Sequence, residues 1–182
     1  MNRTGRLATL LQAGTVAVLA LAISACPESE PATIQSLINH EAWVEVSPGL
    51  DPFDDHRPAE VECTEGGWGM EDGVFEVETD RCPYGTFTQP LLYEPLTDTP
   101  IRISLWHLGL FATPPTEGHV VVQIGDETLF QEFPAIPAES ELWDWSGVPT
   151  EAHEAGSPIY FHLHNHGTNS WRLGDIEGWT EP

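Results

Sequence analysis

The alternation of apolar and polar residues is clearest near the C-terminus, over residues 159–164. One face carries Ile159, Phe161 and Leu163, and the opposite face carries Tyr160, His162 and His164. Alternation with a period of two predicts a β-strand whose apolar face lies against a core. The following Gly167-Thr168-Asn169-Ser170 is typical of a turn. A second apolar stretch at 171–176 follows, so we predict a closing β-hairpin.

Similar patterns predict strands along most of the chain, at residues 42–46, 73–79, 85–89, 100–110, 119–124, 128–133 and 142–145. Turns rich in Pro and Gly separate them at a spacing of about ten residues, which is typical of sandwiches. No pattern typical of an amphipathic helix follows residue 26. The sequence therefore predicts an all-β domain, an antiparallel β-sandwich or jelly roll, over residues 42–182.

The first 26 residues have the organisation of an export signal. Two arginines precede an apolar run at residues 7–22, and small residues then lead to Cys26. This resembles the bacterial lipobox, which implies that residues 1–25 are removed and that Cys26 carries acyl chains. Residues 26–41 then form a flexible tether. An ordinary secretory peptide and an uncleaved anchor are the alternatives.

The expected location of the protein is the bacterial cell envelope. Pro27 follows the cysteine where an Asp would favour retention at the inner membrane, so we prefer the outer membrane, at its periplasmic face or the cell surface. Two cysteines remain after Cys26, and an even pair in an oxidising compartment predicts a Cys63–Cys82 disulfide. A Cys/His metal site is the alternative, although no C-x-x-C spacing supports it.

The charge of the chain excludes one class of partner. There is no lysine, and 29 acidic residues face six arginines, two of which lie in the leader. A nucleic-acid-binding protein needs a basic surface, so nucleic acid is not an expected partner. The acidity favours a role in solubility, with structural or diffuse Ca²⁺ binding as the alternative.

Three stretches resemble a galactose-binding-like jelly roll of the carbohydrate-binding-module type. They read FEVETDRCPYGTFTQPL, DTPIRISLWHLGL and IYFHLHNHGTNSWRLGDIEGW. The chain is also similar to uncharacterised bacterial lipoproteins. The resemblance implies a non-enzymatic protein that binds a saccharide or another surface ligand. A structural envelope protein that works through protein partners is a further alternative.

Aromatic and planar polar side chains are the candidates for sugar binding. Sugar C–H faces pack on aromatic rings, and hydroxyl groups pair with amides and carboxylates. The predicted ligand-binding residues are Trp143, Trp145, Asn165, Asn169, Trp171 and Asp175. Packing in the core and in the hairpin is the alternative for each tryptophan. Neither a G-x-S-x-G motif nor a Gly-rich phosphate loop is present, so no enzyme is predicted.

The histidine strand offers a second type of site. His162, His164 and His166 alternate along one face, and imidazole is a ligand suited to Zn²⁺ and Cu²⁺. His107 and His119, on other strands, could supply a further ligand. The alternative is that these histidines are structural or face solvent. The sequence thus yields a second functional hypothesis, a metal-binding lipoprotein. The first hypothesis, a lipoprotein that binds a saccharide or another surface ligand, requires no cofactor.

Overall fold

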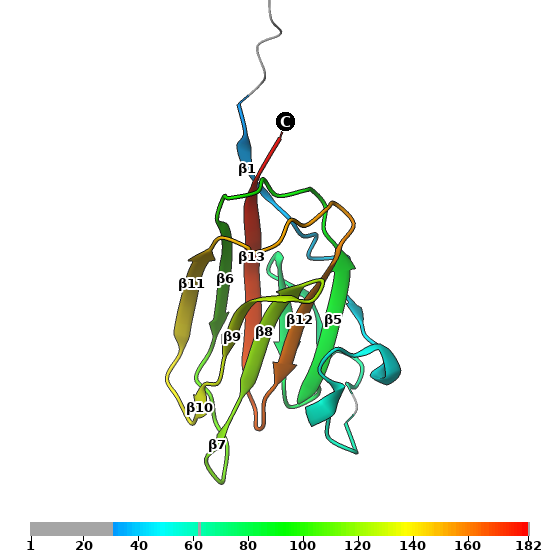
Figure 1. Cartoon of the computed structure of the whole chain (residues 1–182). Helices are drawn as coiled ribbons and strands as arrows, with labels where there is room; N and C mark the ends of the chain where they lie inside the picture. The colour runs from blue at the N-terminus through cyan, green and yellow to red at the C-terminus, as the bar shows by residue number, and fades with distance from the viewer. Residues whose placement is uncertain (1–30, 62, 182) are drawn as a thin grey trace, which may run out of the picture.

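The computed structural model describes residues 31–61 and 63–181, and nearly every regular element in it is a β-strand (Figure 1). The strands are β1 (Thr33–Ser36), β2 (Val44–Glu45), β3 (Trp68–Glu71), β4 (Val74–Glu78), β5 (Tyr84–Pro90), β6 (Ile101–His107), β7 (Thr116–Glu117), β8 (His119–Ile124), β9 (Glu127–Glu132), β10 (Ala135–Ile136), β11 (Glu141–Gly147), β12 (Pro158–His164) and β13 (Ser170–Thr180). Two 3₁₀ turns, η1 (Pro48–Leu50) and η2 (Asp54–His56), precede β3.

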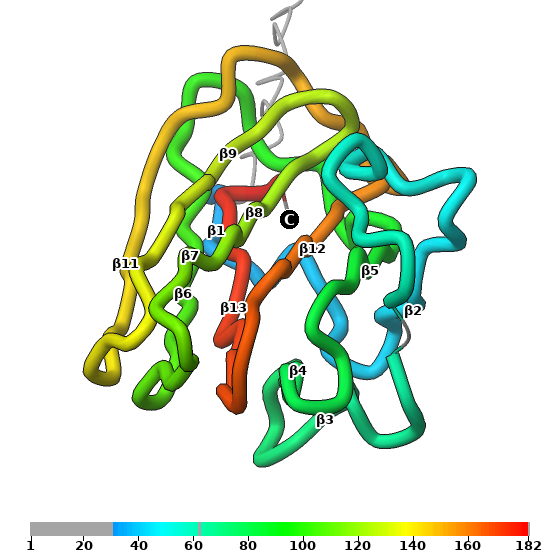
Figure 2. Tube along the Cα trace, turned by 90° about the horizontal axis from the view of Figure 1, so that it is seen from below, coloured from blue at the N-terminus to red at the C-terminus, as the bar shows by residue number. Residues whose placement is uncertain are grey.

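Two antiparallel sheets pack face to face (Figure 2). The first sheet has the order β11-β6-β13-β4-β3, with β1 added beside β13, and the second has the order β2-β5-β12-β8-β9. The short strands β7 and β10 form a separate pair. The predicted antiparallel β-sandwich is confirmed.

The core follows from the alternation in each strand. Ile103 and Leu105 of β6 and Leu173 of β13 point inward from the first sheet, and all three are buried. Phe161 of β12 and Val122 of β8 are cross-strand partners that point inward from the second sheet. Their polar neighbours in sequence therefore face outward on both sheets. These outward-facing polar side chains are the ones available to form a functional site.

The closing hairpin was predicted wrongly. β12 pairs with β5 and β8 in the second sheet, whereas β13 pairs with β6 and β4 in the first. The turn between them therefore crosses from one sheet to the other. Both strands are bordered on each side by other strands, which satisfies their backbone hydrogen bonds without a mutual ladder.

The beginning of the domain also differs from the prediction. Residues 33–41 were assigned to a flexible tether, but β1 pairs with the end of β13 and Leu37 and Ile38 are buried in the core. This edge strand is too short to show alternation, so only its pairing reveals it. Cys26 and the predicted leader lie outside the described residues. Among the residues that are described, no helix is long and apolar enough to cross a membrane.

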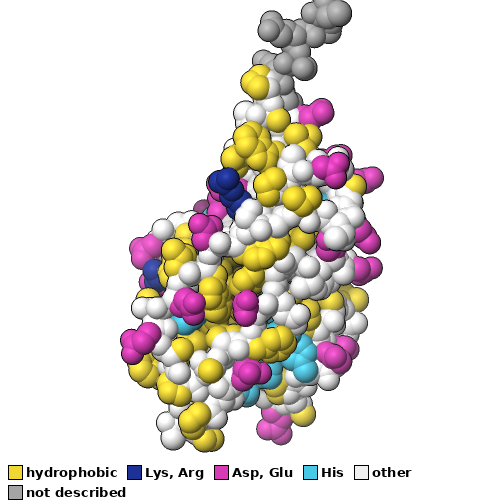
Figure 3. Space-filling model, turned by 60° about the vertical axis from the view of Figure 1, so that its left-hand side comes forward, with side chains coloured by type: hydrophobic (Ala, Val, Ile, Leu, Met, Phe, Trp, Pro, Cys, Tyr) yellow, Lys and Arg dark blue, Asp and Glu magenta, His cyan; other side chains and the backbone are white. Residues whose placement is uncertain are grey.

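A long segment, residues 47–61, lies against the outer side of the second sheet, coloured cyan in Figures 1 and 2. It contains η1 and η2 and leads into the Cys63–Cys82 disulfide. The predicted disulfide is confirmed, and it ties the end of this segment to the chain just before β5. Acidic side chains are scattered over the visible surface instead of forming a single patch (Figure 3).

Candidate metal centre

Three neighbouring strands of the second sheet build an outward face that carries histidines. On β12, His162 lies between Thr86 of β5 and Val121 of β8. His164 lies two residues further on, opposite His119 of β8. Because Phe161 and Leu163 fill the core, the alternation directs these imidazoles outward.

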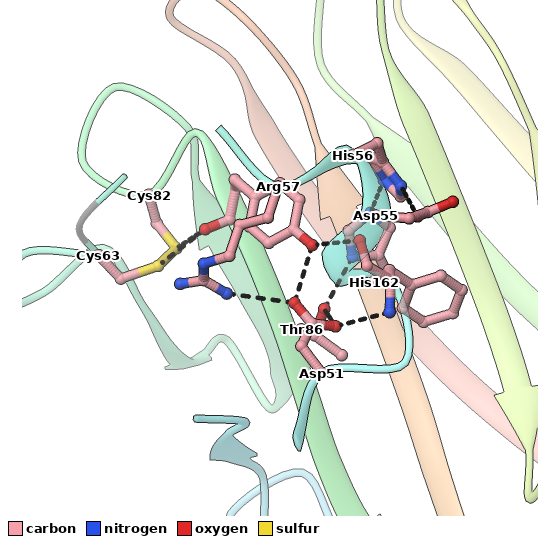
Figure 4. A network of polar contacts seen from close by, with 10 residues as sticks. Asp51, Asp55, His56, Arg57, Cys63, Cys82, Thr86 and His162 are labelled. Atoms are coloured by element: carbon pink, nitrogen blue, oxygen red, sulfur yellow. Dashed lines mark hydrogen bonds and ion pairs between the residues drawn. A yellow bond between two sulfur atoms is a disulfide. The ribbon is translucent and has the colours of Figure 1, made fainter. Parts of the chain in front are cut away.

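The segment 47–61 brings a further histidine over this face. Its anchor is Asp51, a buried carboxylate that accepts hydrogen bonds from the hydroxyls of Tyr84 and Thr86, each at 2.8 Å. Arg57 pairs with the same carboxylate at 3.1 Å. These contacts hold η2 above the strands and place His56 beside His162 (Figure 4).

We call His56, His119 and His162 the histidine centre. Each of them turns one ring nitrogen toward a common point. His56 Nε2 lies 3.0 Å from His162 Nε2 and 3.2 Å from His119 Nδ1, and the three nitrogens lie within 4.8 Å of one another. The ring centroids are separated by 4.9, 5.0 and 5.2 Å. An ion bound at Zn–N distances of about 2.05 Å with tetrahedral angles requires centroids about 5.2 Å apart. The rings are therefore spaced as ligands of a single ion would be.

Hydrogen bonds to the outer nitrogens decide where the protons lie. Asp55 accepts a hydrogen bond from His56 Nδ1 at 2.9 Å. Thr86 gives its hydroxyl proton to Asp51, so it accepts from His162 Nδ1 at 2.8 Å (Figure 4). When both rings are neutral, their Nε2 atoms carry lone pairs that face each other at 3.0 Å. A shared cation resolves this repulsion, and such outer hydrogen bonds are the usual way of orienting histidine ligands.

The outer nitrogen of His119 has a hydrogen-bond partner that can either donate or accept. The side-chain amide of Gln131 lies 2.8 Å from His119 Nε2. An amide can turn either its NH₂ group or its oxygen to the ring, so it can match either tautomer of His119. With the oxygen toward Nε2–H, the lone pair of His119 Nδ1 points into the centre.

Two imidazoles of the centre, those of His119 and His162, are kept neutral at neutral pH by a lowered pKa. Burial, followed by the nearby His56, lowers the pKa of His119 to about 4. Burial and the neighbouring histidines hold the pKa of His162 well below its ordinary value. Neutral imidazole is the form that binds metals, so at neutral pH these two rings need not lose a proton to act as ligands.

Aromatic rings flank the centre on two sides. Phe53 stacks on His162 with centroids 4.4 Å apart, and Phe133 stacks on His119 at the same distance. His162 is buried, whereas His56 and His119 are half-buried. Histidine side chains gather in a patch at the surface near the lower end of the molecule (Figure 3). Because His56 and His119 are partly exposed, the centre can be reached from solvent.

The structure separates the four histidines that were predicted as ligands. His162 belongs to the centre. The ring of His164 stacks 5.8 Å from that of His56, and His166 lies 4.8 Å from His164, so both are near but outside it. His107 points into the core, between Trp143 and Trp171, because it shares the inward face of β6 with Leu105. It cannot reach the outer face of the second sheet.

The predicted saccharide residues do not converge on a common surface. Trp171 is fully buried, and Trp143 and Trp145 pack against the core. The buried Asn165 and Asn169 serve the turns: Asn165 donates to the hydroxyl of Thr79 at 3.2 Å, and Asn169 accepts from the backbone N–H of Phe111 at 2.6 Å. Asp175 lies apart on the outer face of the first sheet, where it accepts from Ser36 at 2.6 Å.

Sequence reasoning missed His56 and Asp51. Both lie in a stretch that reads as a loop, SPGLDPFDDHRP, and no periodicity relates them to β12. The one available signal was the Asp55-His56 pair, since carboxylates often accept from the outer nitrogen of a ligating histidine. His119 was named as a possible further ligand, and the structure brings it to the centre.

A second group of potential ligands, Glu71, Glu76 and Glu78, lies on the outer face of the first sheet and is called the carboxylate cluster. Glu76 is buried there and accepts hydrogen bonds from the hydroxyl of Ser170 and from the guanidinium of Arg172, the latter at 3.1 and 3.2 Å. Burial alone would raise the pKa of Glu76, but its hydrogen bonds with Glu71, Ser170 and Arg172 outweigh this and lower it. The cluster thus already contains its own cation.

No family model matches this sequence, and no curated protein matches it. Similar solved structures include a carbohydrate-binding module of family 4, with 12% identity over 76% of this chain and 95% of that one, at a TM-score of 0.46. A mutant module of family 29 shows 13% identity over 83% and 94%, at 0.42. An arabinose-bound family 51 α-L-arabinofuranosidase shows 12% identity over 79% of this chain but only 26% of its own, at 0.45. At these identities and scores, the likeness says nothing about a ligand of this chain.

Proposed function

We propose that this protein binds a late transition-metal ion, Zn²⁺ or Cu²⁺, through His56, His119 and His162. The observation that carries the proposal is the convergence of three ring nitrogens, two of which lie 3.0 Å apart. Neutral imidazole suits these two ions, and hard ions such as Ca²⁺ prefer oxygen ligands. The proposed role is binding and not catalysis.

Metal titration of the purified protein tests this proposal. We expect one tightly bound equivalent of Cu²⁺, with an electron paramagnetic resonance spectrum that shows coupling to three nitrogens. His162→Asn should weaken binding at least about 100-fold, because it removes the best-oriented ligand. His40→Gln is the matched control, since His40 is half-buried and bonds to the backbone of β4 outside the centre. Substoichiometric binding, or equal affinity in His162→Asn, would contradict the proposal.

We also propose that the protein is anchored in the bacterial cell envelope by acyl chains on Cys26. The arrangement of the domain is compatible with this: β1 begins at Thr33, and it lies at the end of the sandwich opposite the η2 segment (Figure 1). Seven residues reach at most about 25 Å, so the metal centre would face away from the membrane. Cys26→Ala should move the protein from the membrane fraction to the soluble fraction, whereas an unchanged distribution would contradict an anchor.

Saccharide binding is a second candidate, and one feature of the first sheet favours it. A polar groove on its outer face is lined by Arg102, Ser104, Asp144, Ser146, Asp175 and Glu177. The half-buried ring of Trp106 lies beside it, over Gly174, where any side chain would collide with the ring. An aromatic plane next to planar polar groups is the chemistry that sugars need.

An oligosaccharide screen monitored by tryptophan fluorescence tests this second candidate. Binding should be lost in Trp106→Ala and retained in Leu142→Ala, which alters the cross-strand neighbour of Trp106. A screen without any binding, or binding that survives Trp106→Ala, would contradict saccharide binding in this groove.

A further inference from the structure

Two histidines continue from the histidine centre toward solvent. His164 follows His162 on the same face of β12, and its ring is nearly parallel to that of His56, at 5.8 Å. His166 stands in the turn after β12, is exposed, and has its ring 4.8 Å from that of His164. The five histidines therefore form a continuous row from the surface to the buried His162.

His164 and His166 can share an ion of their own. Their separation of 4.8 Å is close to the separations within the centre, the smallest of which is 4.9 Å. His164 Nε2 is buried and has no hydrogen-bond partner among the described residues. A buried polar atom without a partner is costly, and a bound ion would satisfy it.

In this structure, His164 and His166 do not add a ligand to the histidine centre. The inward nitrogens of His56, His119 and His162 lie within 4.8 Å of one another, and no nitrogen of His164 joins that group. The two positions are therefore distinct but adjacent. The negative charge of the chain, -23, and the exposed Asp54 and Asp55 next to His56 favour the approach of cations to this end.

We propose that His164 and His166 form an outer two-histidine site that accepts the metal ion from solvent and passes it to the histidine centre. This inference rests on the proposed metal-binding function. The transfer is an exchange of ligands: each bond broken between the ion and an outer imidazole nitrogen is replaced by one to His56, His119 or His162. The ion keeps its charge, and no oxidant, reductant or proton is required.

Cu²⁺ loading of the full-length protein, followed by stopped-flow quenching of tryptophan fluorescence, tests the route. We expect wild type to bind a tight and a weak equivalent. His164→Asn and His166→Asn should lose the weak equivalent and load the tight site about tenfold more slowly, because the local concentration of the ion beside the centre falls. The affinity of the tight site should be unchanged, and His40→Gln should behave as wild type.

The outcomes separate this inference from the proposed function. If both variants load as fast as wild type while one tight equivalent is retained, the route is wrong and the centre stands. If His164→Asn weakens the tight site itself, His164 is a ligand of the centre and the outer site is wrong. If wild type binds no metal, both proposals fail.

Discussion

The histidine centre and the carboxylate cluster are two groups of possible metal ligands on opposite outer faces of the sandwich. Each brings three donor groups within 4.8 Å. In the carboxylate cluster, Arg172 and Ser170 already satisfy Glu76. In the histidine centre, the outer nitrogens of His56 and His162 have oxygen partners, whereas their inner nitrogens meet only other imidazole nitrogens. Proximity of donors is thus not sufficient; a metal site is indicated where lone pairs converge without a partner.

The largest effect should come from removing the cation of the carboxylate cluster. Arg172→Met leaves the buried Glu76 without its guanidinium, and we expect the free energy of unfolding to fall by about 3 kcal/mol at neutral pH. Arg102→Met is the control, because Arg102 is exposed on the same face. Urea denaturation of both variants measures the difference. Equal losses would show that Arg172 does not balance the cluster.

The pH dependence of that effect has a defined sign. The pKa of Glu76 is lowered in the folded protein, so its ionised form adds stability above the unfolded pKa and the contribution is lost as pH falls through the folded pKa. Arg172→Met should raise this pKa and remove that contribution. The difference between wild type and Arg172→Met should therefore shrink below about pH 4. A difference that grows on acidification would contradict this account.

Adding metal ions should affect the two clusters differently. Zn²⁺ at 100 times its dissociation constant should stabilise the folded state by about 2.7 kcal/mol, and thus raise the melting temperature by about 5–10 °C. The same concentration of Ca²⁺ should cause no shift, because Arg172 occupies the carboxylate cluster. The zinc shift should vanish in His162→Asn. If Ca²⁺ raises the melting temperature of His162→Asn, the carboxylate cluster binds a metal ion despite Arg172, and the contrast between the two clusters is wrong.

The sequence predicts the sandwich well because a period of two marks each long strand. Ile101, Ile103 and Leu105 point into the core as that pattern requires. Which strands become neighbours is decided by packing between distant segments, and this explains the wrongly predicted closing hairpin. The four residues of β1 carry no pattern that distinguishes them from a linker.

The site is predictable only where it lies on strands. His162 is found by alternation. His107 was predicted as a further ligand only because it is a histidine on another strand, and it occupies the inward phase of β6. Whether a polar residue in a strand faces the core or solvent is fixed by its apolar neighbours, and those of His107 are Leu105 and Ile103. His56 comes from a loop held by Asp51, and contacts between a loop and a sheet leave no period in the sequence.

The smallest effect tests whether hydrogen bonding to the outer nitrogens matters. Thr86→Val keeps the shape of the side chain but removes the acceptor for His162 Nδ1, so the proton of that ring is no longer held on the outer side. We expect metal affinity to fall by about 10–100-fold. Thr88→Val is the matched control, because Thr88 lies on the same face of β5 and its hydroxyl donates to the carbonyl of Ile159 instead.

Rescue distinguishes positioning of the ring from simple packing. Thr86→Ser restores the hydroxyl while losing a methyl group, so it should regain most of the metal affinity that Thr86→Val loses. If serine binds metal as weakly as valine, the methyl packing of Thr86 matters and the hydrogen bond does not. If valine binds as tightly as wild type, His162 is held by Phe53 and its strand alone, and the contrast between satisfied outer and unsatisfied inner nitrogens loses its functional meaning.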